Sequence, residues 1–247
     1  MTNELSVSLG SFIRQPALVA ANVARRGIDV SCLGHIASPL LQICPQNLGV
    51  IDELTLDQIN EAHPEANIRL HANIHLLPMR MLKDVVNFNP ADPYWIRLKE
   101  LTQYGAMSVY SAHAGLREDH DMTFVIEQQA RLMDFLRIPV ALEGHYPTRE
   151  NRYLASDWAE WEMMFNSGLP YVVDLSHAAI IANLCRQRND TLLIAMLSHA
   201  NCLEVHISGN DERADQHTPL HGHEWWWSLM THIHSEASIF YEGVFRV

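Results

Sequence analysis

Short runs rich in β-branched and apolar residues alternate along this chain with longer segments of helical period. Such alternation is typical of repeated βα units, which build a parallel sheet covered by helices. The runs that predict strands are Leu5–Leu9, Ile28–Cys32, Ile68–His71, Met107–Ser111, Val140–Glu143, Tyr171–Asp174, Cys202–His206 and Ala237–Tyr241. Eight parallel strands in 247 residues predict an α/β fold of the (β/α)8, or TIM-barrel, type, formed as a single domain over 1–247.

The segments between these runs predict the helices. Apolar residues recur there at three- and four-residue spacing, over Pro16–Arg26, Met122–Leu136, Leu154–Phe165, His177–Gln187 and Glu224–His232. Three prolines interrupt the region from Gly34 to Asn67, so we expect a long loop there, followed by one helix near Leu56–Ala62. No linker rich in Gly, Ser or Pro divides the chain, and we therefore expect no domain boundary.

Composition narrows the class of function. No run of about 18 apolar residues could cross a bilayer, no secretory signal is recognisable, and the four cysteines form no C-x-x-C pair, so we expect a cytoplasmic protein with reduced thiols. The net charge of −12 disfavours a polyanionic partner unless positive charge is concentrated locally or supplied by metal ions. Fifteen histidines beside this acidic excess favour a metal site, because neutral imidazole is a common metal ligand.

Histidines and carboxylates recur where the predicted strands end. In a barrel of this type the catalytic groups come from these strand ends and from the loops after them. The nine candidates are His71, His113, Glu143, Asp174, His177, His206, Asp215, His217 and Glu242.

Each candidate also has an ordinary structural interpretation. A single strand-end histidine is commonly a hydrogen-bonded structural residue, Asp174 suits a helix cap, and Glu143 or Glu242 suits a cap or a pair with arginine. Their joint occurrence favours a metal site, because carboxylates that converge at one barrel mouth repel each other unless cations or protons compensate them. Nine ligands exceed what one ion takes, and they predict two or three divalent ions with a bridging carboxylate.

This ordered set resembles the xylose isomerase-like barrel superfamily, and within it most closely endonuclease IV (AP endonuclease family 2). The residues "HAG" at His113 and "HISGNDERADQH" at His206 resemble motifs of that family, and the resemblance extends from about His71 to Glu242. It implies three metal sites with zinc favoured and iron or manganese as alternatives: His71 and His113 with Glu143 as a bridge, then Asp174, His206 and Glu242, then His177, Asp215 and His217.

Two departures separate the chain from endonuclease IV. Glu143 is followed by Gly144 and His145 where that family has Asn-Thr, and the loop after the second predicted strand has no Lys or Arg. DNA recognition needs basic contacts to phosphate. Arg149 and Arg152 could form a basic patch with neighbouring tyrosines, but a solvated helix entrance is favoured. We therefore expect a small-molecule or phosphoester substrate, with duplex DNA disfavoured by the acidic charge; a homo-oligomer is left open.

The leading hypothesis is hydrolysis of a phosphoester by a metal-activated hydroxide, with Glu143 as the catalytic residue and His145 as a substrate-binding group. One alternative is a sugar-type isomerase or epimerase with a single metal. Such enzymes of the superfamily hold their metal with a Glu, Asp, His, Glu quartet, which Glu143, Asp174, His206 and Glu242 resemble. A second alternative is a multinuclear iron oxidase acting on a peptide, resembling the methanobactin-forming enzymes, which share a D-x-H loop but generally have Asn where this chain has His177. A third is a non-catalytic metal-binding protein.

Overall fold

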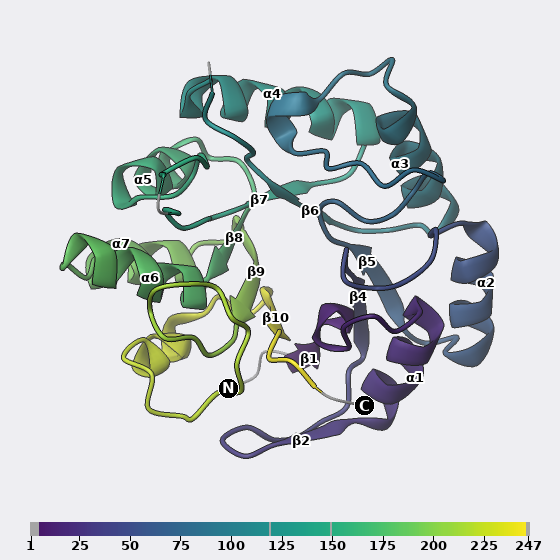
Figure 1. The fold of residues 1–247 in the computed structure, drawn as a ribbon, viewed down its shortest axis with the longest axis horizontal. Coiled ribbons are helices and arrows are strands. Elements are labelled where there is room, and N and C mark those ends of the chain that lie inside the picture. Colours follow the sequence, from purple (N-terminus) through teal and green to yellow (C-terminus); the bar gives the residue numbers. More distant parts are fainter. Residues whose placement is uncertain (1–4, 119, 149, 246–247) are drawn as a thin grey trace.

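The structure is a computed structural model that describes residues 5–118, 120–148 and 150–245. Within these residues the sheet has eight strands, in the order β1-β10-β9-β8-β7-β6-β5-β4, and every neighbouring pair is parallel. Helices surround the sheet (Figure 1). The predicted TIM barrel is therefore confirmed. The strands are β1 (Leu5–Val7), β4 (Leu40–Ile43), β5 (Asn67–Leu70), β6 (Tyr110–His113), β7 (Val140–Glu143), β8 (Tyr171–Asp174), β9 (Cys202–Ile207) and β10 (Ser238–Tyr241).

Serine side chains join the two end strands of this sheet. The backbone N–H of Val7 in β1 donates to Ser38 Oγ at 2.7 Å, and the N–H of Leu40 in β4 donates to Ser6 Oγ at 3.4 Å. These bonds satisfy backbone donors that an open sheet edge would leave exposed. The hydroxyl groups thus help to close the barrel between β1 and β4.

The second barrel strand differs from the prediction. Ile28–Cys32 was expected to fill this place, but β2 (Ile28–Val30) pairs antiparallel with β3 (Gly34–Ile36) in a separate hairpin. Asp29 in β2 is exposed, whereas all four residues of β4 are buried. A barrel strand is covered on both faces, and the run Leu40–Ile43, which has no charged residue and whose only polar residue is Gln42, meets that requirement where Asp29 does not. The long loop expected from Gly34 to Asn67 was therefore wrong.

The helices follow the predictions more closely. They are α1 (Ala17–Arg26), α2 (Glu53–Ala62), α3 (Pro93–Tyr104), α4 (Met122–Leu136), α5 (Trp158–Asn166), α6 (Leu175–Cys185) and α7 (Asp190–Leu197), with 3-10 turns η1 (Leu9–Ser11), η2 (Val85–Asn87) and η3 (Trp227–His232). The helix expected over Glu224–His232 is the 3-10 turn η3. The sequence analysis missed α3 and α7, although both carry start signals: Asp92 and Asn189 accept bonds from the N–H groups of Tyr94 and Leu192.

The main apolar core lies between the sheet and the helices and includes the buried rings of Trp95, Trp161 and Trp226. A second, small cluster contains Val109, Ala141 and Val172. Ala141 and Val172 stand two residues before Glu143 and Asp174, so they share the inward side of their strands. No helix in the described part of the chain is long and apolar enough to span a bilayer.

A matched pair of leucine variants tests the reassigned strand. Leu41 in β4 is fully buried, so Leu41→Ala should lower the free energy of unfolding by about 2 to 5 kcal/mol in urea denaturation. Leu48 lies in the same region but is 52% exposed, and Leu48→Ala should change it by less than about 0.5 kcal/mol. Equal effects of the two variants would contradict the placement of β4 inside the barrel.

Candidate metal centre

The carboxyl ends of the parallel strands bring the predicted ligands to one end of the barrel. His113, Glu143 and Asp174 are the last residues of β6, β7 and β8, and His71 directly follows β5. The strand register pairs His113 with Glu143 and Asp174 with His206, which places these side chains at one level. Glu242 directly follows β10. The structure therefore brings these candidate residues to one end of the barrel.

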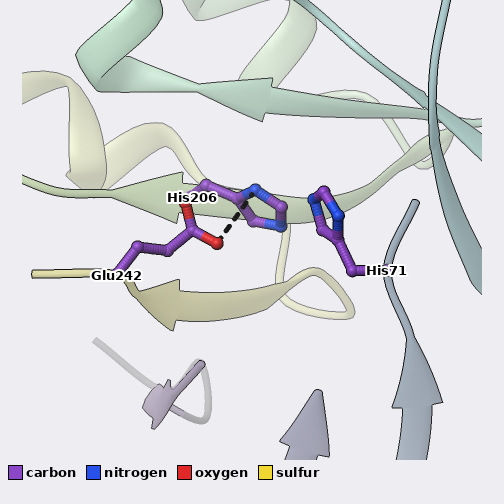
Figure 2. A group of neighbouring side chains, drawn as sticks. All are labelled: His71, His206 and Glu242. Atoms are coloured by element: carbon purple, nitrogen blue, oxygen red, sulfur yellow. Dashed lines mark ion pairs between the residues drawn. The ribbon is translucent and has the colours of Figure 1, made fainter. Parts of the chain in front are cut away.

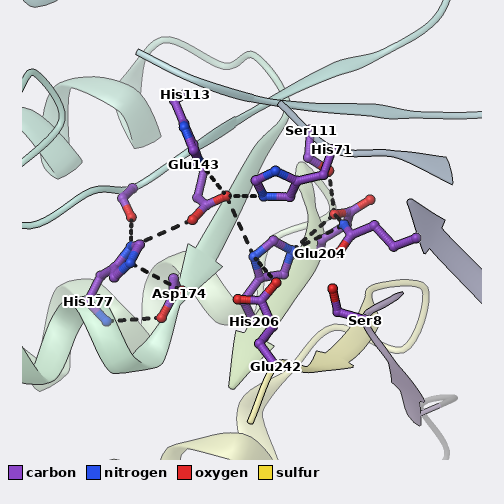
Figure 3. A network of polar contacts seen from close by, with 12 residues as sticks. Ser8, His71, Ser111, His113, Glu143, Asp174, His177, Glu204, His206 and Glu242 are labelled. Carbon is purple, nitrogen blue, oxygen red and sulfur yellow. Dashed lines mark hydrogen bonds and ion pairs between the residues drawn. The ribbon is translucent and has the colours of Figure 1, made fainter. Parts of the chain in front are cut away.

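Glu143 lies at the centre of this group (Figure 3). Its Oε2 atom is 2.8 Å from His71 Nε2, 3.6 Å from His113 Nε2 and 3.6 Å from His206 Nδ1. Its Oε1 atom is 3.6 Å from His177 Nδ1. The carboxylate is buried, and it contacts four of the five candidate imidazoles.

Asp174 serves both as a helix cap and as part of the cluster. Its Oδ1 atom accepts bonds from the backbone N–H groups of Ser176 and His177 at 2.7 and 2.9 Å, which starts α6. The other oxygen, Oδ2, lies 3.6 Å from His177 Nε2. His177 Nδ1 donates to the carbonyl of Gly144 at 2.8 Å, so the lone pair of the neutral ring is on Nε2. Asp174 is therefore a helix cap, and its second oxygen is directed at the other candidate ligands.

The loop after β9 brings the last two candidates to the same place. Asp215 Oδ2 is 3.5 Å from His177 Nε2 and 2.8 Å from His217 Nε2. His217 Nδ1 is 3.8 Å from Glu242 Oε2, and Glu242 Oε1 is 3.7 Å from His206 Nδ1. Figure 2 shows Glu242 facing His206, with His71 beside that ring. All nine predicted ligands thus form one connected network.

Two observations show that this donor set fits metal ions. Five buried atoms of the set have no hydrogen-bond partner within the described residues: His71 Nδ1, Asp174 Oδ2, His206 Nδ1, Asp215 Oδ1 and His217 Nδ1. Most contacts between donors measure 3.5–3.8 Å, which is long for a hydrogen bond. Two ligands about 2.1 Å from one tetrahedral zinc are about 3.4 Å apart, so the donors have the spacing of atoms that share an ion.

The donors also fall into groups of suitable size. Three groups have ligand atoms within 4.8 Å of one another: His71, His113 and Glu143; His71, His206 and Glu242; and Glu143, Asp174 and His177. Glu143 and His71 each belong to two of them, and a carboxylate in two groups can bridge two ions. The groups share members, which is the arrangement expected of a multinuclear centre.

The electrostatics of the centre favour added positive charge. Burial alone would lower the pKa of the imidazoles, but the carboxylates around them raise the pKa of His206 to about 10 and that of His217 to about 9. The pKa of His177 is also raised, by Asp174 and Asp215 against the effect of burial. Burial lowers the pKa of His113 to about 3. Metal ions bind neutral imidazole, and they would replace the protons that otherwise compensate these carboxylates.

His145 lies at the border between the metal centre and a larger cavity. Its ring stacks on Tyr153, Tyr146 and His177, with centroid distances of 4.4, 4.8 and 5.2 Å. It lines both a 120 Å³ cavity among the candidate ligands and an adjoining 490 Å³ cavity. Burial lowers its pKa to about 4, so the ring is neutral near pH 7. This position agrees with the predicted contact to substrate without testing it.

The neighbouring basic patch is only partly described. Arg149 lies outside the described residues, and the exposed side chain of Arg152 is 3.8 Å from Glu150. Tyr146 and Tyr153 pack on the ring of His145.

Three further residues of the site escaped the sequence analysis. Cys44 follows β4 and lines the 120 Å³ cavity; it was missed because β4 itself was missed. Asp84 lies 3.8 Å from His113, late in the long loop after β5, where its distance from the strand end gave no signal. Glu204 lies inside β9, two residues before His206, and its signal is a lone acid in an otherwise uncharged strand next to a candidate ligand. Hydrogen bonds from His206 and Ser111 and the charge of Arg69 outweigh burial and hold the pKa of Glu204 at about 2.

Comparisons with known proteins identify the fold. No protein-family profile and no curated protein sequence matches this chain. An AP endonuclease of family 2 from Brucella melitensis aligns with a TM-score of 0.67 at 13% identity, covering 99% of this chain and 94% of that one. A D-tagatose 3-epimerase-like protein aligns with a TM-score of 0.65 at 12% identity, covering 96% and 90%. A xylose isomerase domain-containing protein from Salmonella typhimurium LT2 aligns with a TM-score of 0.59 at 10% identity, covering 97% of this chain and 88% of that one. The chain has the fold of these xylose isomerase-like barrels.

Elemental analysis tests the number of ions. Protein purified without added metal should contain two or three divalent ions per chain, because nine donors exceed the four that one zinc takes. The double variant Asp215→Asn, His217→Ala should contain about one ion fewer. His221→Ala, His223→Ala removes two exposed histidines and should match the native content. If the native protein contained one ion per chain and the Asp215→Asn, His217→Ala variant contained the same, the result would contradict a multinuclear centre.

Proposed function

We propose that this chain is a metal-dependent hydrolase of a phosphoester, with two or three divalent ions held by the nine residues described above. The observation that supports this most is the single network around Glu143. It includes His71, His113, Asp215 and His217, four side chains that a one-metal site built on Glu143, Asp174, His206 and Glu242 does not need. The unpartnered buried atoms on three of these four indicate that they serve an ion rather than the fold.

The residues themselves have distinct parts in this reaction. Bound ions would supply a hydroxide at neutral pH and neutralise charge on the phosphoryl oxygens. Glu143 is the catalytic residue: its two oxygens face different histidines, so it can hold two subsites together and orient the attacking oxygen between them. That oxygen adds to phosphorus, the bond from phosphorus to the ester oxygen breaks, and the alcohol leaves with a proton from solvent. The Gly144 carbonyl fixes the ring of His177 through its Nδ1–H.

The substrate would enter through the 490 Å³ cavity. This volume suits a small molecule, and His113 and His145 lie at its inner wall. Arg80 and His120 bring basic groups to the cavity, whereas Asp84 and Glu118 bring acidic ones. A mixed wall in a chain of net charge −12 suits a small phosphoester better than duplex DNA. We propose zinc as the ion.

An epimerase of a sugar-like substrate is the second candidate. Glu143, Asp174, His206 and Glu242 lie together in the structure, and two carboxylates beside one ion could exchange a proton with a sugar carbon. An epimerase-like protein is among the structures with the same fold. One manganese or cobalt ion per chain would favour this reaction. Iron with oxygen consumption on a thiol-containing peptide would favour an oxidase instead.

The variant Glu143→Gln tests the proposed hydrolase. It keeps the shape of the side chain but removes the charge that two subsites share, so kcat on p-nitrophenyl phosphate or its bis-ester should fall by about 10²–10³-fold. Glu162→Gln on the exposed face of α5 is the matched control and should keep native activity. Removal of metal with a chelator should abolish turnover, and zinc should restore it.

Three outcomes would overturn the proposal. The native protein could be fully active without metal, Glu143→Gln could hydrolyse phosphoesters at the native rate, or the native protein could leave phosphoesters intact while epimerising D-tagatose with one manganese ion. A protein that binds several ions but turns over no substrate, with Glu143→Gln equal to native, would indicate a metal-binding role without catalysis.

A further inference from the structure

A layer of polar side chains lies beneath the candidate ligands. In four strands the residue two positions before a site residue is polar: Gln42 before Cys44, Arg69 before His71, Ser111 before His113 and Glu204 before His206. Alternate residues of a strand point to the same side, so these four project into the barrel one step below the metal centre. Gln42, Ser111 and Glu204 are completely buried.

Glu204 is the centre of this layer (Figure 3). Its Oε1 accepts a hydrogen bond from Arg69 Nη1 at 2.8 Å. Its Oε2 accepts bonds from Gln42 Nε2 at 2.9 Å and from Ser111 Oγ at 2.5 Å. His206 Nε2 lies 3.3 Å from the same oxygen. Guanidinium and amide nitrogens can only donate, so the carboxylate is held as an acceptor.

This arrangement decides which nitrogen of His206 carries a proton. Next to a carboxylate that accepts from every side, Nε2 is the donor, and Gln42 Nε2 at 3.4 Å is no acceptor for it. When the ring is neutral its lone pair is therefore on Nδ1. Nδ1 is buried, has no hydrogen-bond partner in the described chain, and faces Glu143 Oε2 and Glu242 Oε1 at 3.6 and 3.7 Å.

We propose that Glu204 is a positioning residue that fixes His206 in its Nε2–H tautomer, so that Nδ1 is presented as the ligand atom of the metal centre. A carboxylate that accepts from the far nitrogen of a histidine ligand sets the direction and the basicity of the ring. Arg69 neutralises the carboxylate and holds its Oε1, which leaves Oε2 for the ring. A purely structural barrel would fill this level with apolar side chains, as Val109, Ala141 and Val172 do nearby.

The variant Glu204→Gln should reverse this arrangement. Arg69 Nη1 is a donor and needs an oxygen as its partner, so the amide oxygen of the new side chain would take the position of Oε1. The amide nitrogen would then take the position of Oε2. There it donates to His206 Nε2 and favours the Nδ1–H tautomer, which directs a proton into the metal centre. Zinc affinity of the subsite that includes His206 should fall by about 10–100-fold. The control Ser111→Ala removes a bond to the same oxygen without contacting His206, and it should stay within about threefold of native.

The test combines zinc titration with ¹⁵N NMR of the histidine rings. The native zinc protein should show His206 with a protonated Nε2 and a zinc-bound Nδ1, and Glu204→Gln should lose this signature together with one zinc ion, while circular dichroism shows the fold retained. Unchanged zinc affinity and an unchanged His206 signal in Glu204→Gln would overturn the proposal. If that variant does not fold, the native spectrum decides by itself: a native His206 with Nδ1–H refutes the assignment.

This inference rests on the proposed metal centre, and the two can fail separately. A native protein without zinc affinity would remove the metal centre itself. A native protein that binds zinc and shows the same His206 signal in the Glu204→Gln variant would leave the centre intact and remove only the role of Glu204.

Discussion

Convergence of negative charge at one end of the barrel is the constraint on which the rest of the structure depends. Glu143, Asp174, Asp215 and Glu242 come from separate strands and loops, and they lie close enough to contact the same histidines. Carboxylates this near one another need cations or protons to compensate them. The five imidazoles between them meet that need with protons, or with divalent ions that the same imidazoles bind.

The barrel tolerates this centre because its stability comes from elsewhere. The large apolar core packs outside the sheet, where the buried tryptophans of α3 and α5 contribute. Inside the barrel, Glu204 and its donors share one level with the apolar Ala141 and Val172, and the candidate ligands lie at the next level. Each buried polar group of the lower level has a partner, with the exception of Arg69 Nε among the described atoms. Stabilising and functional residues are thus separated by the sheet itself.

The wrong assignment of the second barrel strand has a physical cause. Two segments are candidates for the second barrel strand. Ile28–Cys32 has the composition of a strand, whereas Leu40–Ile43 follows a proline in a region with little periodicity, so the local sequence pattern favours the first. In the structure Leu40–Ile43 forms the barrel strand, because its residues are buried on both faces of the sheet. Such burial depends on contacts with segments distant in the sequence, which a local pattern does not show. Cys44 was lost with that strand, and Glu204 was lost because only strand ends were searched. The third omission, Asp84, comes from a loop whose path is set by tertiary packing.

By itself the sequence determined the βα repeat, the barrel and the nine strand-end or loop residues, Glu143 among them, that the structure joins in one network, because parallel strands place their carboxyl ends at one edge and residue type is visible there. Only the tertiary structure decided which run closes the barrel, which oxygen of Asp174 caps a helix and which stays free, and which nitrogen of His206 faces the centre. Those choices depend on distances between atoms far apart in the chain, and no local pattern encodes them.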